Sequence, residues 1–446
     1  MKRGIIVVLI LGFPLLLKAQ TDSVETITLE EAIEIALENN YQLKVAQNNY
    51  ELSQNQELSE KADYLPSLNA NISGNRNVGR TFDQSTGSIT TETNNSLRSS
   101  LSADIPIFSG FENLHSLKSS QFDKMSSEEN LERVRENIIF NTASNYLQFI
   151  LDKQFLEIDR ENLAASQKTL EQVRAQVEVG SRPNVDLYNQ EAQVANNELA
   201  VVNSENALES SRLQLIQTLQ IDPRKEYEFV SPDIDGQTIT APEYDLEELV
   251  TTALENRSDL QREKYNIEAI RHQLSATKGS LYPSLSLSGN LSSGYSELQR
   301  SSFNDQFFDL NINRSVGLSL NIPIFGNLNR RTNVQSQRIS YRNALLNLQD
   351  IELQIVQEVN QAYNDYTSYV KQLESSEKAL RAAERSYETQ RQRYNVGAGT
   401  LIELSDANAQ YVEAQASRAQ ALFRLIFQQQ LLDYYIGKLN ENISLE

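Results

Sequence analysis

Four short segments of the chain alternate apolar and polar residues. From Ser67 to Ser73, for example, every second residue is aliphatic and the residues between are Asn or Ser. A period of two is that of a β-strand with one face in an apolar environment, so the pattern predicts strands at about 66–75, 97–106, 283–292 and 314–323. About ten residues is enough for a tilted strand to cross a bilayer. A soluble sandwich with one wet face would show the same alternation.

The stretches between the paired strands are polar and are predicted to be loops, from about Asn75 to Asn95 and from about Ser293 to Arg314. Before each pair of strands, the spacing of Thr28 with Glu31, and of Asp245 with Glu248, predicts a helix that begins with a capping box. These helices are expected to run to about residues 64 and 281, where a proline follows.

After each pair of strands, apolar residues recur every seven positions over about 70 residues. A sustained seven-residue repeat predicts antiparallel coiled-coil helices, at about 111–179 and 328–396, each followed by a tight turn and a second long helix. The repeating positions are Phe149, Leu156, Leu163, Leu170 and Val177; Leu187, Val194, Val201, Leu208 and Leu215; Tyr366, Leu373, Leu380, Tyr387 and Tyr394; and Leu404, Tyr411, Arg418, Leu425 and Leu432, with Arg418 the one polar residue.

The chain consists of two copies of one unit, offset by 217 residues, as from Pro66 to Pro283. Leu-Glu-Glu-Ala at Leu29 returns as Leu-Glu-Glu-Leu, and Ile-Pro-Ile-Phe occurs in both halves. This duplication predicts a first repeat over 21–222 with its helical turn at 180–183, a linker over 223–245, a second repeat over 246–439 with its turn at 397–400, and a tail over 440–446.

The beginning of the chain has the pattern of a signal peptide. Lys2 and Arg3 precede an apolar run that contains Pro14, and Ala19 and Gln20 follow it. This layout predicts export and cleavage near residue 20. A retained anchor is the alternative.

Composition excludes several kinds of site. The chain has no cysteine, which excludes disulfides, thiolate catalysis and cysteine-ligated metal. His115 and His272 are far apart in sequence, so a histidine-based metal site is not expected. The net charge of −20 disfavours nucleic acid as a partner. The Gly397-Ala-Gly-Thr stretch has no lysine after it and follows no strand, so it does not predict a phosphate loop.

Four strands cannot close a barrel alone, because two edges would remain exposed. The pattern therefore requires several copies of the chain, without fixing their number. The predicted fold class is an α+β membrane protein made of two tandem repeats.

In their order and duplication, these motifs resemble the TolC family of outer-membrane factors. The resemblance rests on Leu29-Glu-Glu-Ala with Ala36-Leu-Glu-Asn-Asn, on Pro-Ser-Leu, on Ile-Pro-Ile-Phe and on the glycine turns, and it extends from about Thr28 to Leu439. It implies a homotrimer with a twelve-stranded β-barrel in the outer membrane of a Gram-negative bacterium, continued by a coiled-coil α-barrel in the periplasm.

The function that the resemblance implies is a passive, porin-like exit channel of an efflux or type I secretion system. The implied partners are outer-membrane lipid, a periplasmic adaptor (membrane fusion protein) and an inner-membrane pump. The resemblance implies no enzymatic activity and no cofactor. The cargo, whether drug, metal ion or protein, stays open because the pump and adaptor select it.

In this family the helical turns form the periplasmic tip, where the adaptor docks. The resemblance therefore assigns Gly180, Pro183, Gly397 and Gly399 to the tip turns and to adaptor docking. The turns are at minimum tight hairpins with glycine where a helix ends.

Two acidic residues follow the second turn. Glu403 and Asp406 are three apart on one helix face and match the family's acidic constriction positions, with Glu at one position where the best-known members have Asp. In a trimer they would form two carboxylate rings that favour cations. Ordinary exposed acids are the alternative.

A tip gate is also implied. Tyr394 and Asp186 match two of the three residues that hold the family's closed tip, whereas the arginine position falls at Gly399. Arg182 occupies the equivalent place in the first repeat and is a hypothetical substitute. Tyr394 also completes a seven-residue series, so a packing function is equally compatible with the sequence.

Two other classes of function remain as alternatives. A soluble periplasmic coiled-coil adaptor or scaffold would explain the helices and the signal peptide, but not four aliphatic-faced strands. An exported enzyme would need a clustered catalytic site, and the serines here have no histidine placed to activate one.

Overall fold

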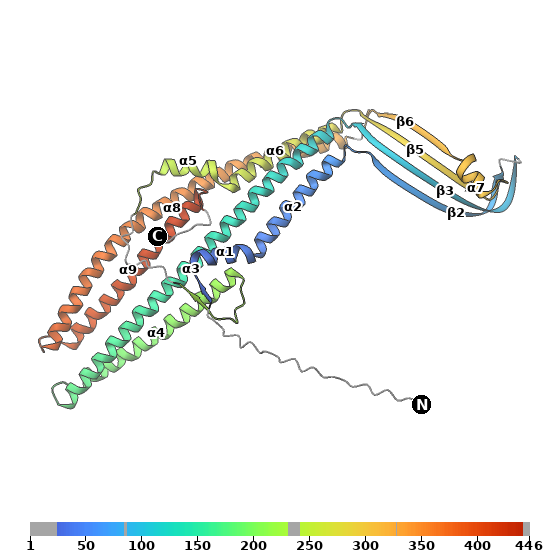
Figure 1. The fold of residues 1–446 in the computed structure, drawn as a ribbon. Helices are drawn as coiled ribbons and strands as arrows, with labels where there is room; N and C mark the ends of the chain where they lie inside the picture. Colours follow the sequence, from blue (N-terminus) through green and yellow to red (C-terminus); the bar gives the residue numbers. More distant parts are fainter. Residues whose placement is uncertain (1–24, 84–86, 231–240, 327, 440–446) are drawn as a thin grey trace, which may run out of the picture.

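The computed structural model describes residues 25–83, 87–230, 241–326 and 328–439. The expected signal peptide and C-terminal tail, and the middle of the expected linker, lie outside these residues. The described chain is elongated, with a β-sheet at one end and two helical hairpins that reach the other end together (Figure 1). None of its described helices is both long enough and apolar enough to span a bilayer.

Four antiparallel strands form an open sheet in the order β2 (Ser67–Asp83), β3 (Ser88–Phe108), β5 (Ser284–Ser296) and β6 (Asn313–Asn321). Each repeat contributes one hairpin, and pairing of β3 with β5 joins the two hairpins. Strands β2 and β6 are the edges: among the described strands, β2 pairs only with β3, and β6 only with β5.

One face of this sheet carries unburied aliphatic side chains. Leu68 is 65% exposed, and Val316, which lies on the same face across the sheet, is 81% exposed. The long helices lead away from the sheet in Figure 1, and only the short α7 (Phe303–Asp305) lies at its far end. A single chain therefore leaves both an apolar face and two backbone edges unsatisfied.

The first strand pair is longer than the sequence predicts. Most of the stretch from Asn75 to Asn95, expected to be a loop, is paired strand, with Val78 opposite Thr93 and Phe82 opposite Ile89. The prediction was wrong here because polar residues interrupt the alternation while the backbone ladder continues, and the Thr-rich tip suits a pleated surface.

A folded loop connects β5 to β6 in the second strand pair, and it is shorter than the expected loop from 293 to 314 because β5 continues to Ser296. Helix α7 (Phe303–Asp305) leads into a π-helical turn over Gln306–Leu310. The fully buried Gln306 side chain accepts a hydrogen bond from Ser296 N–H at 2.9 Å and donates to the carbonyl of Ser301 at 2.7 Å. This glutamine organises the loop from within.

Each repeat opens with two helices, where the sequence predicted one. Helices α1 (Leu29–Asn39) and α2 (Tyr41–Ala62) are separated at Asn40, where ψ is 121°. The Asn40 side chain caps α2 by accepting hydrogen bonds from the first N–H groups of that helix. In the second repeat, α5 (Leu246–Asn256) and α6 (Ser258–Gly279) are separated at Arg257. Apolar periodicity missed these breaks because one extended residue changes the helix direction without interrupting the pattern.

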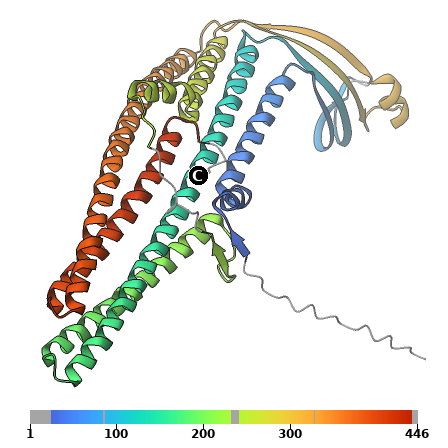
Figure 2. The ribbon, with the colours of Figure 1, turned by 60° about the vertical axis from the view of Figure 1, so that its left-hand side comes forward.

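The long hairpins are α3 (Glu112–Glu178) with α4 (Asn184–Leu219) and α8 (Asn329–Asn395) with α9 (Leu401–Tyr435). Helices α3 and α8 have 67 residues each, which is about 100 Å at 1.5 Å per residue. Figure 2 shows the two hairpins side by side. Every residue of the four seven-residue series is buried or partly buried, Arg418 included, so the repeat identified the real helix contacts.

The main apolar core lies where α1 packs on α3 and α4, about midway along the helices (Figure 1). It includes Ile33 and Leu215, and it extends to a parallel pair of short strands, β1 (Glu25–Ile27) and β4 (Tyr227–Phe229). The Tyr146 hydroxyl lies 3.0 Å from the carbonyl oxygen of Ile27 and 2.6 Å from that of Val230. The beginning of the first repeat is thus tied to its end.

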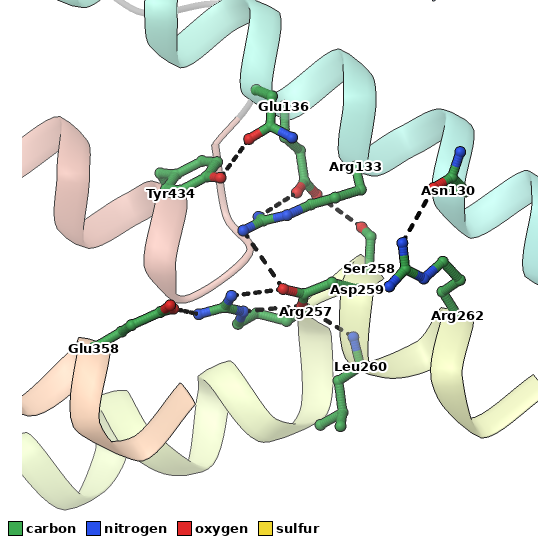
Figure 3. Close-up of polar contacts among 11 residues, drawn as sticks. Asn130, Arg133, Glu136, Arg257, Ser258, Asp259, Leu260, Arg262, Glu358 and Tyr434 are labelled. Carbon is green, nitrogen blue, oxygen red and sulfur yellow. Dashed lines mark hydrogen bonds and ion pairs between the residues drawn. The ribbon is translucent and has the colours of Figure 1, made fainter. Parts of the chain in front are cut away.

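A buried arginine lies at the centre of a polar network that joins the second repeat to the first (Figure 3). Arg257, 3% exposed, donates to both carboxylate oxygens of Asp259 at 3.0 and 2.6 Å and to Glu358 on α8 at 2.6 Å. Asp259 also lies 3.5 Å from Arg133 on α3, which pairs with Glu136 at 3.0 Å. Burial alone would raise the pKa of the Asp259 carboxyl, but the hydrogen bond from Arg257 and the two arginine charges outweigh it and lower the pKa.

We expect Arg257→Met to destabilise the protein by about 3 kcal/mol, because it leaves the carboxylate of Asp259 without its main partner at a largely buried site. Chemical unfolding followed by circular dichroism measures this loss. Arg160→Met is the matched control, because Arg160 pairs with Glu205 at 2.8 Å on the surface and should cost at most about 1 kcal/mol. Equal losses in the two variants would contradict a special contribution of the buried network.

Candidate functional site at the hairpin tips

Both hairpins end in the same kind of turn. Gly180 and Gly397 have φ of +75° and +76°, a left-handed conformation that favours glycine. In the first turn, the N–H of Ser181 donates to the carbonyl of Gln176 at 2.9 Å, and the equivalent bond in the second turn is 2.8 Å. Such bonds close a helix in a Schellman motif, so the turn geometry itself accounts for these two glycines.

Arg182, Asp186 and Tyr394 meet at the tips, although Tyr394 belongs to the other hairpin. The guanidinium carbon of Arg182 lies 4.3 Å from the centroid of the Tyr394 ring, and Nη1 of Arg182 lies 3.4 Å from Oδ2 of Asp186. The side chains of Arg182 and Asp186 are only 17% and 21% exposed. A cation over an aromatic face contributes roughly 1 kcal/mol, more when desolvated. This contact links the first turn to the end of α8.

The contacts of Tyr394 are made by its ring and not by its hydroxyl. Its hydroxyl is buried and has no hydrogen-bond partner among the described residues. Burial raises the pKa of this hydroxyl, while Arg182 lowers it and Asp186 raises it, and the net result is a neutral phenol. The ring packs with Val173 and Leu404 in a small apolar cluster.

The second turn offers little room for another arginine. A Cβ added to Gly399 would lie 3.3 Å from the Cβ of Arg393 and 3.3 Å from the backbone N of Tyr394. That spacing is tight for any side chain at this position. The cation next to Tyr394 comes instead from Arg182 in the first repeat.

Glu403 closes a capping box at the start of α9. Its backbone N–H donates to Oγ1 of Thr400 at 3.2 Å, and its carboxylate accepts from the N–H of Thr400 at 2.9 Å. This backbone hydrogen bond is the main cause that lowers the pKa of the Glu403 carboxyl. This role was not predicted from the sequence, although Thr-x-x-Glu is the signature of a capping box.

Asp406 lies one turn further along α9 and is exposed, as Glu403 is. In the part of the chain that the structure describes, neither acid contacts Arg182 or Tyr394. The tip thus contains an interlocked cluster (Arg182, Asp186 and Tyr394) and, separately, two exposed acids on one helix face.

A largely polar cavity of about 210 Å³ lies between the hairpins next to this cluster. Its lining includes Lys168, Gln190, Arg391 and Asn408, which come from all four long helices. Gln190 is buried and donates to the carbonyl and the hydroxyl of Ser166, both at 3.0 Å. The hairpins therefore share apolar contacts at their tips and a wetter interface behind them.

Among the described residues, no three His, Cys, Asp or Glu side chains gather in a way that could hold a metal ion. The two histidines are far apart in sequence, yet their Nδ1 atoms lie 3.0 Å apart. They meet because α3 and α6 pack together along the seam between the repeats. The pair lies toward the sheet, far from the tips.

Comparison with known proteins covers both repeats. The family profile described as Outer membrane efflux protein matches residues 32–219 and 249–438. Outer membrane protein TolC of Escherichia coli K12 is 23% identical over 318 residues, which are 69% of this chain and 62% of TolC. The match thus spans less than two thirds of that relative.

Two further similarities extend over more of the chain. The pyoverdine export outer membrane protein OpmQ of Pseudomonas aeruginosa is 23% identical over 402 residues, 88% of this chain and 81% of OpmQ. The crystal structure of the outer membrane channel CmeC of Campylobacter jejuni has a TM-score of 0.80 at 17% identity and covers 93% of this chain and 87% of CmeC. At that identity the likeness shows the fold.

The fold, the paired turns and the family profile agree with the resemblance that the sequence motifs indicated. Because the profile covers most of each repeat, that resemblance is confirmed, and the chain belongs to the outer membrane efflux protein family, which is the family of TolC.

Proposed function

We propose that this chain is a subunit of an outer-membrane efflux channel of a Gram-negative bacterium, a passive exit duct from the periplasm to the outside. One observation carries the proposal: an open sheet with an unburied aliphatic face continues directly into helices of 67 residues. Strands with one aliphatic face suit lipid on the outside of a barrel. Helices of about 100 Å suit a conduit across the periplasm.

The channel is a homotrimer in this proposal. Edge strands β2 and β6 need partners, and three chains with four strands each would close a barrel of twelve. Exposed apolar residues on α8 also recur every seven positions, at Ile339, Leu346 and Leu353, with exposures of 55, 62 and 70%. An exposed seven-residue apolar series of this kind indicates that another helix packs against α8 in the assembly.

The duplicated sequence indicates which helix that is. Within one chain, α6 of the second repeat packs along α3 of the first. The counterparts at the 217-residue offset are α2 and α8, which in a ring would meet between neighbouring subunits in the same way. Helix α2 offers exposed apolar residues of its own, Val45 and Leu52, again seven apart.

The tips are where the duct is gated and where its partners dock. The turns around Gly180, Pro183, Gly397 and Gly399 would receive a periplasmic adaptor, which recruits an inner-membrane pump. The relative named for pyoverdine export supports an export function for the family. Pump and adaptor would select the cargo of this chain.

The cluster of Arg182, Asp186 and Tyr394 holds the closed tip in this proposal. One cation–π contact joins the two hairpins, and an ion pair within the first hairpin holds Arg182 beside Tyr394. Glu403 and Asp406 form two carboxylate rings at the constriction. The capping box keeps Glu403 ionised and near the beginning of α9, so its structural role and its proposed role in the ring are compatible.

The acidic rings are tested by single-channel conductance of the purified oligomer in a planar bilayer. We expect cation selectivity and block by a trivalent cation in the parent, and block weakened roughly tenfold or more, about 1.4 kcal/mol, in Glu403→Gln with Asp406→Asn. Glutamine preserves the capping geometry at position 403.

Glu34→Gln with Glu38→Gln, two exposed changes on α1, is the charge-matched control and should leave the block unchanged. Conductance with unaltered block in the Glu403 and Asp406 variant would place the constriction elsewhere. A folded protein that stays out of membranes and gives no conductance would favour the soluble scaffold.

The tip lock is tested with Arg182→Ala. Loss of the cation over Tyr394 should raise the mean conductance several-fold, because roughly 1–2 kcal/mol of the closing contact is removed at each of three tips. Tyr394→Phe keeps the ring and removes only an unpartnered hydroxyl, so it should behave like the parent. Arg174→Ala removes an exposed arginine from a 3.6 Å pair with Glu191 inside one hairpin. If it opened the channel as much as Arg182→Ala, the lock would be refuted.

A further inference from the structure

The only two histidines of the chain face each other in the seam between the repeats. His115 is on α3 and His272 on α6, and their ring planes are 28° from parallel with centroids 5.3 Å apart. His272 is 6% exposed and also stacks on Phe122 at 5.6 Å. Close to the pair, the helices nearly touch, because a Cβ on Gly110 would lie 2.4 Å from the carbonyl oxygen of Gly279.

The hydrogen bonds define the protonation of both rings. Nη2 of Arg271 lies 3.3 Å from Nε2 of His272, and because arginine can only donate, this Nε2 accepts and carries no proton. The proton of neutral His272 is therefore on Nδ1, where it is donated to Nδ1 of His115 at 3.0 Å. His115 accepts and carries its own proton on Nε2. The observed arrangement thus requires both rings to be neutral.

A proton added to either ring breaks this chain of hydrogen bonds. On His272 the added proton would point at the guanidinium of Arg271, and on His115 it would set N–H against N–H. The pair cannot relax easily, because the seam around it is held by Ser119, whose hydroxyl donates to the carbonyl of Ala269 at 2.9 Å, and by the glycine contact.

The charges that act on the pair are mostly positive. They are Lys118 on α3 and Arg271 and Lys278 on α6, with Glu268 as the one acid. Glu268 is itself paired with Arg271 at 2.5 Å. On α2, which packs against α3, Glu57 pairs with Lys61 and Lys124. Burial and the charges of Asp63 and Glu112 raise the pKa of Glu60 on the same helix. Neither α2 nor α8 contributes a charge to the pair among the described residues. The same surroundings disfavour a metal cation here.

We propose that His115 and His272 form a proton-sensitive joint between the two repeats, closed while both rings are neutral and loosened when acid protonates them. The joint lies at the end of the helices next to the sheet, so loosening would weaken helix packing where the strands meet the helices. The inference does not depend on the proposed channel function.

The direction of the effect follows from linkage. Burial first, and then the neighbouring cations, lower the pKa of both histidines below the ordinary value of 6.5. An unfolded or opened seam therefore binds more protons than the closed seam as the pH falls below 6.5. Stability of the seam is complete above that pH and declines below it until the lowered pKa values are reached.

The internal repeat supplies the matched control. At the 217-residue offset, His115 corresponds to Thr332 and His272 to Asn55. Each of these two residues occupies the equivalent position on its own helix, α8 or α2. His115→Thr with His272→Asn therefore copies residues that the fold already accepts and removes the titrating groups.

The first experiment is a titration of the purified protein labelled with ¹³C-histidine, in which only two ring signals are expected. We expect both to titrate below pH 6.5, in two coupled steps. In the single variant His115→Thr, the remaining ring should titrate in one step. Two independent titrations near 6.5 in the parent would overturn the proposal without reference to any variant.

The second experiment is hydrogen exchange followed by mass spectrometry at pH 7.5 and 5.0, corrected for the intrinsic exchange rate. Between these pH values, we expect protection of peptides from residues 112–126 and 262–279 to fall roughly tenfold more in the parent than in the double variant, the change that one pKa unit produces. Peptides from the hairpin tips should not differ. Equal loss of protection in parent and variant, or loss confined to the tips, would overturn the joint.

Discussion

Unpaired backbone groups along strands β2 and β6 are the constraint on which the rest of this molecule depends. Inside a bilayer, each free N–H or C=O is costly because no water is available to bond it. The four-stranded sheet of one chain cannot meet that condition alone. The proposed ring of three chains would meet that condition, and it would also account for the exposed seven-residue series on α2 and α8. This apolar stripe is exposed to water in a single chain and would be buried between neighbouring chains in a ring.

Because the chain is duplicated, two equivalent helix pairings are possible in the proposed ring. Packing of α3 on α6 within a chain and packing of α8 on α2 between chains would be equivalent contacts if the repeats were identical. They have diverged at the seam. Arg257 stands where the first repeat has the helix-capping Asn40, and the histidine pair stands where the other seam would bring Thr332 and Asn55 together. Both changes add polar contacts with strict geometry near the seam inside the chain. These contacts favour packing of α6 on α3 of the same chain over packing on α8 of a neighbouring chain.

The two ends of the helices are held by different kinds of contact. Toward the sheet and at mid-length, the helices are joined by close glycine packing, a buried ion network and the main apolar core. At the tips, four residues form a small apolar cluster, with one cation–π contact beside it and a polar cavity behind it. Contacts that are few and partly wet are the ones that open at low cost. The distribution of contacts is therefore suited to a rigid tube with a movable end.

Sequence alone determined the number and order of most elements, because the periods of two and seven and the 217-residue repeat are written directly in the apolar positions. The resemblance carried by its motifs also assigned Asp186 and Tyr394 to the tip, with Arg182 as a hypothetical third member, and the structure brings the three into contact. Three things were decided by tertiary structure. The first strand pair extends through a polar segment because backbone pairing does not need apolar side chains. Glu403 accepts from a backbone N–H in addition to facing solvent. The histidines, 157 residues apart, meet only because α6 packs on α3. Local patterns record which face of an element is apolar, but not which distant element covers it, and that is why the seam between the repeats could not be read from the sequence.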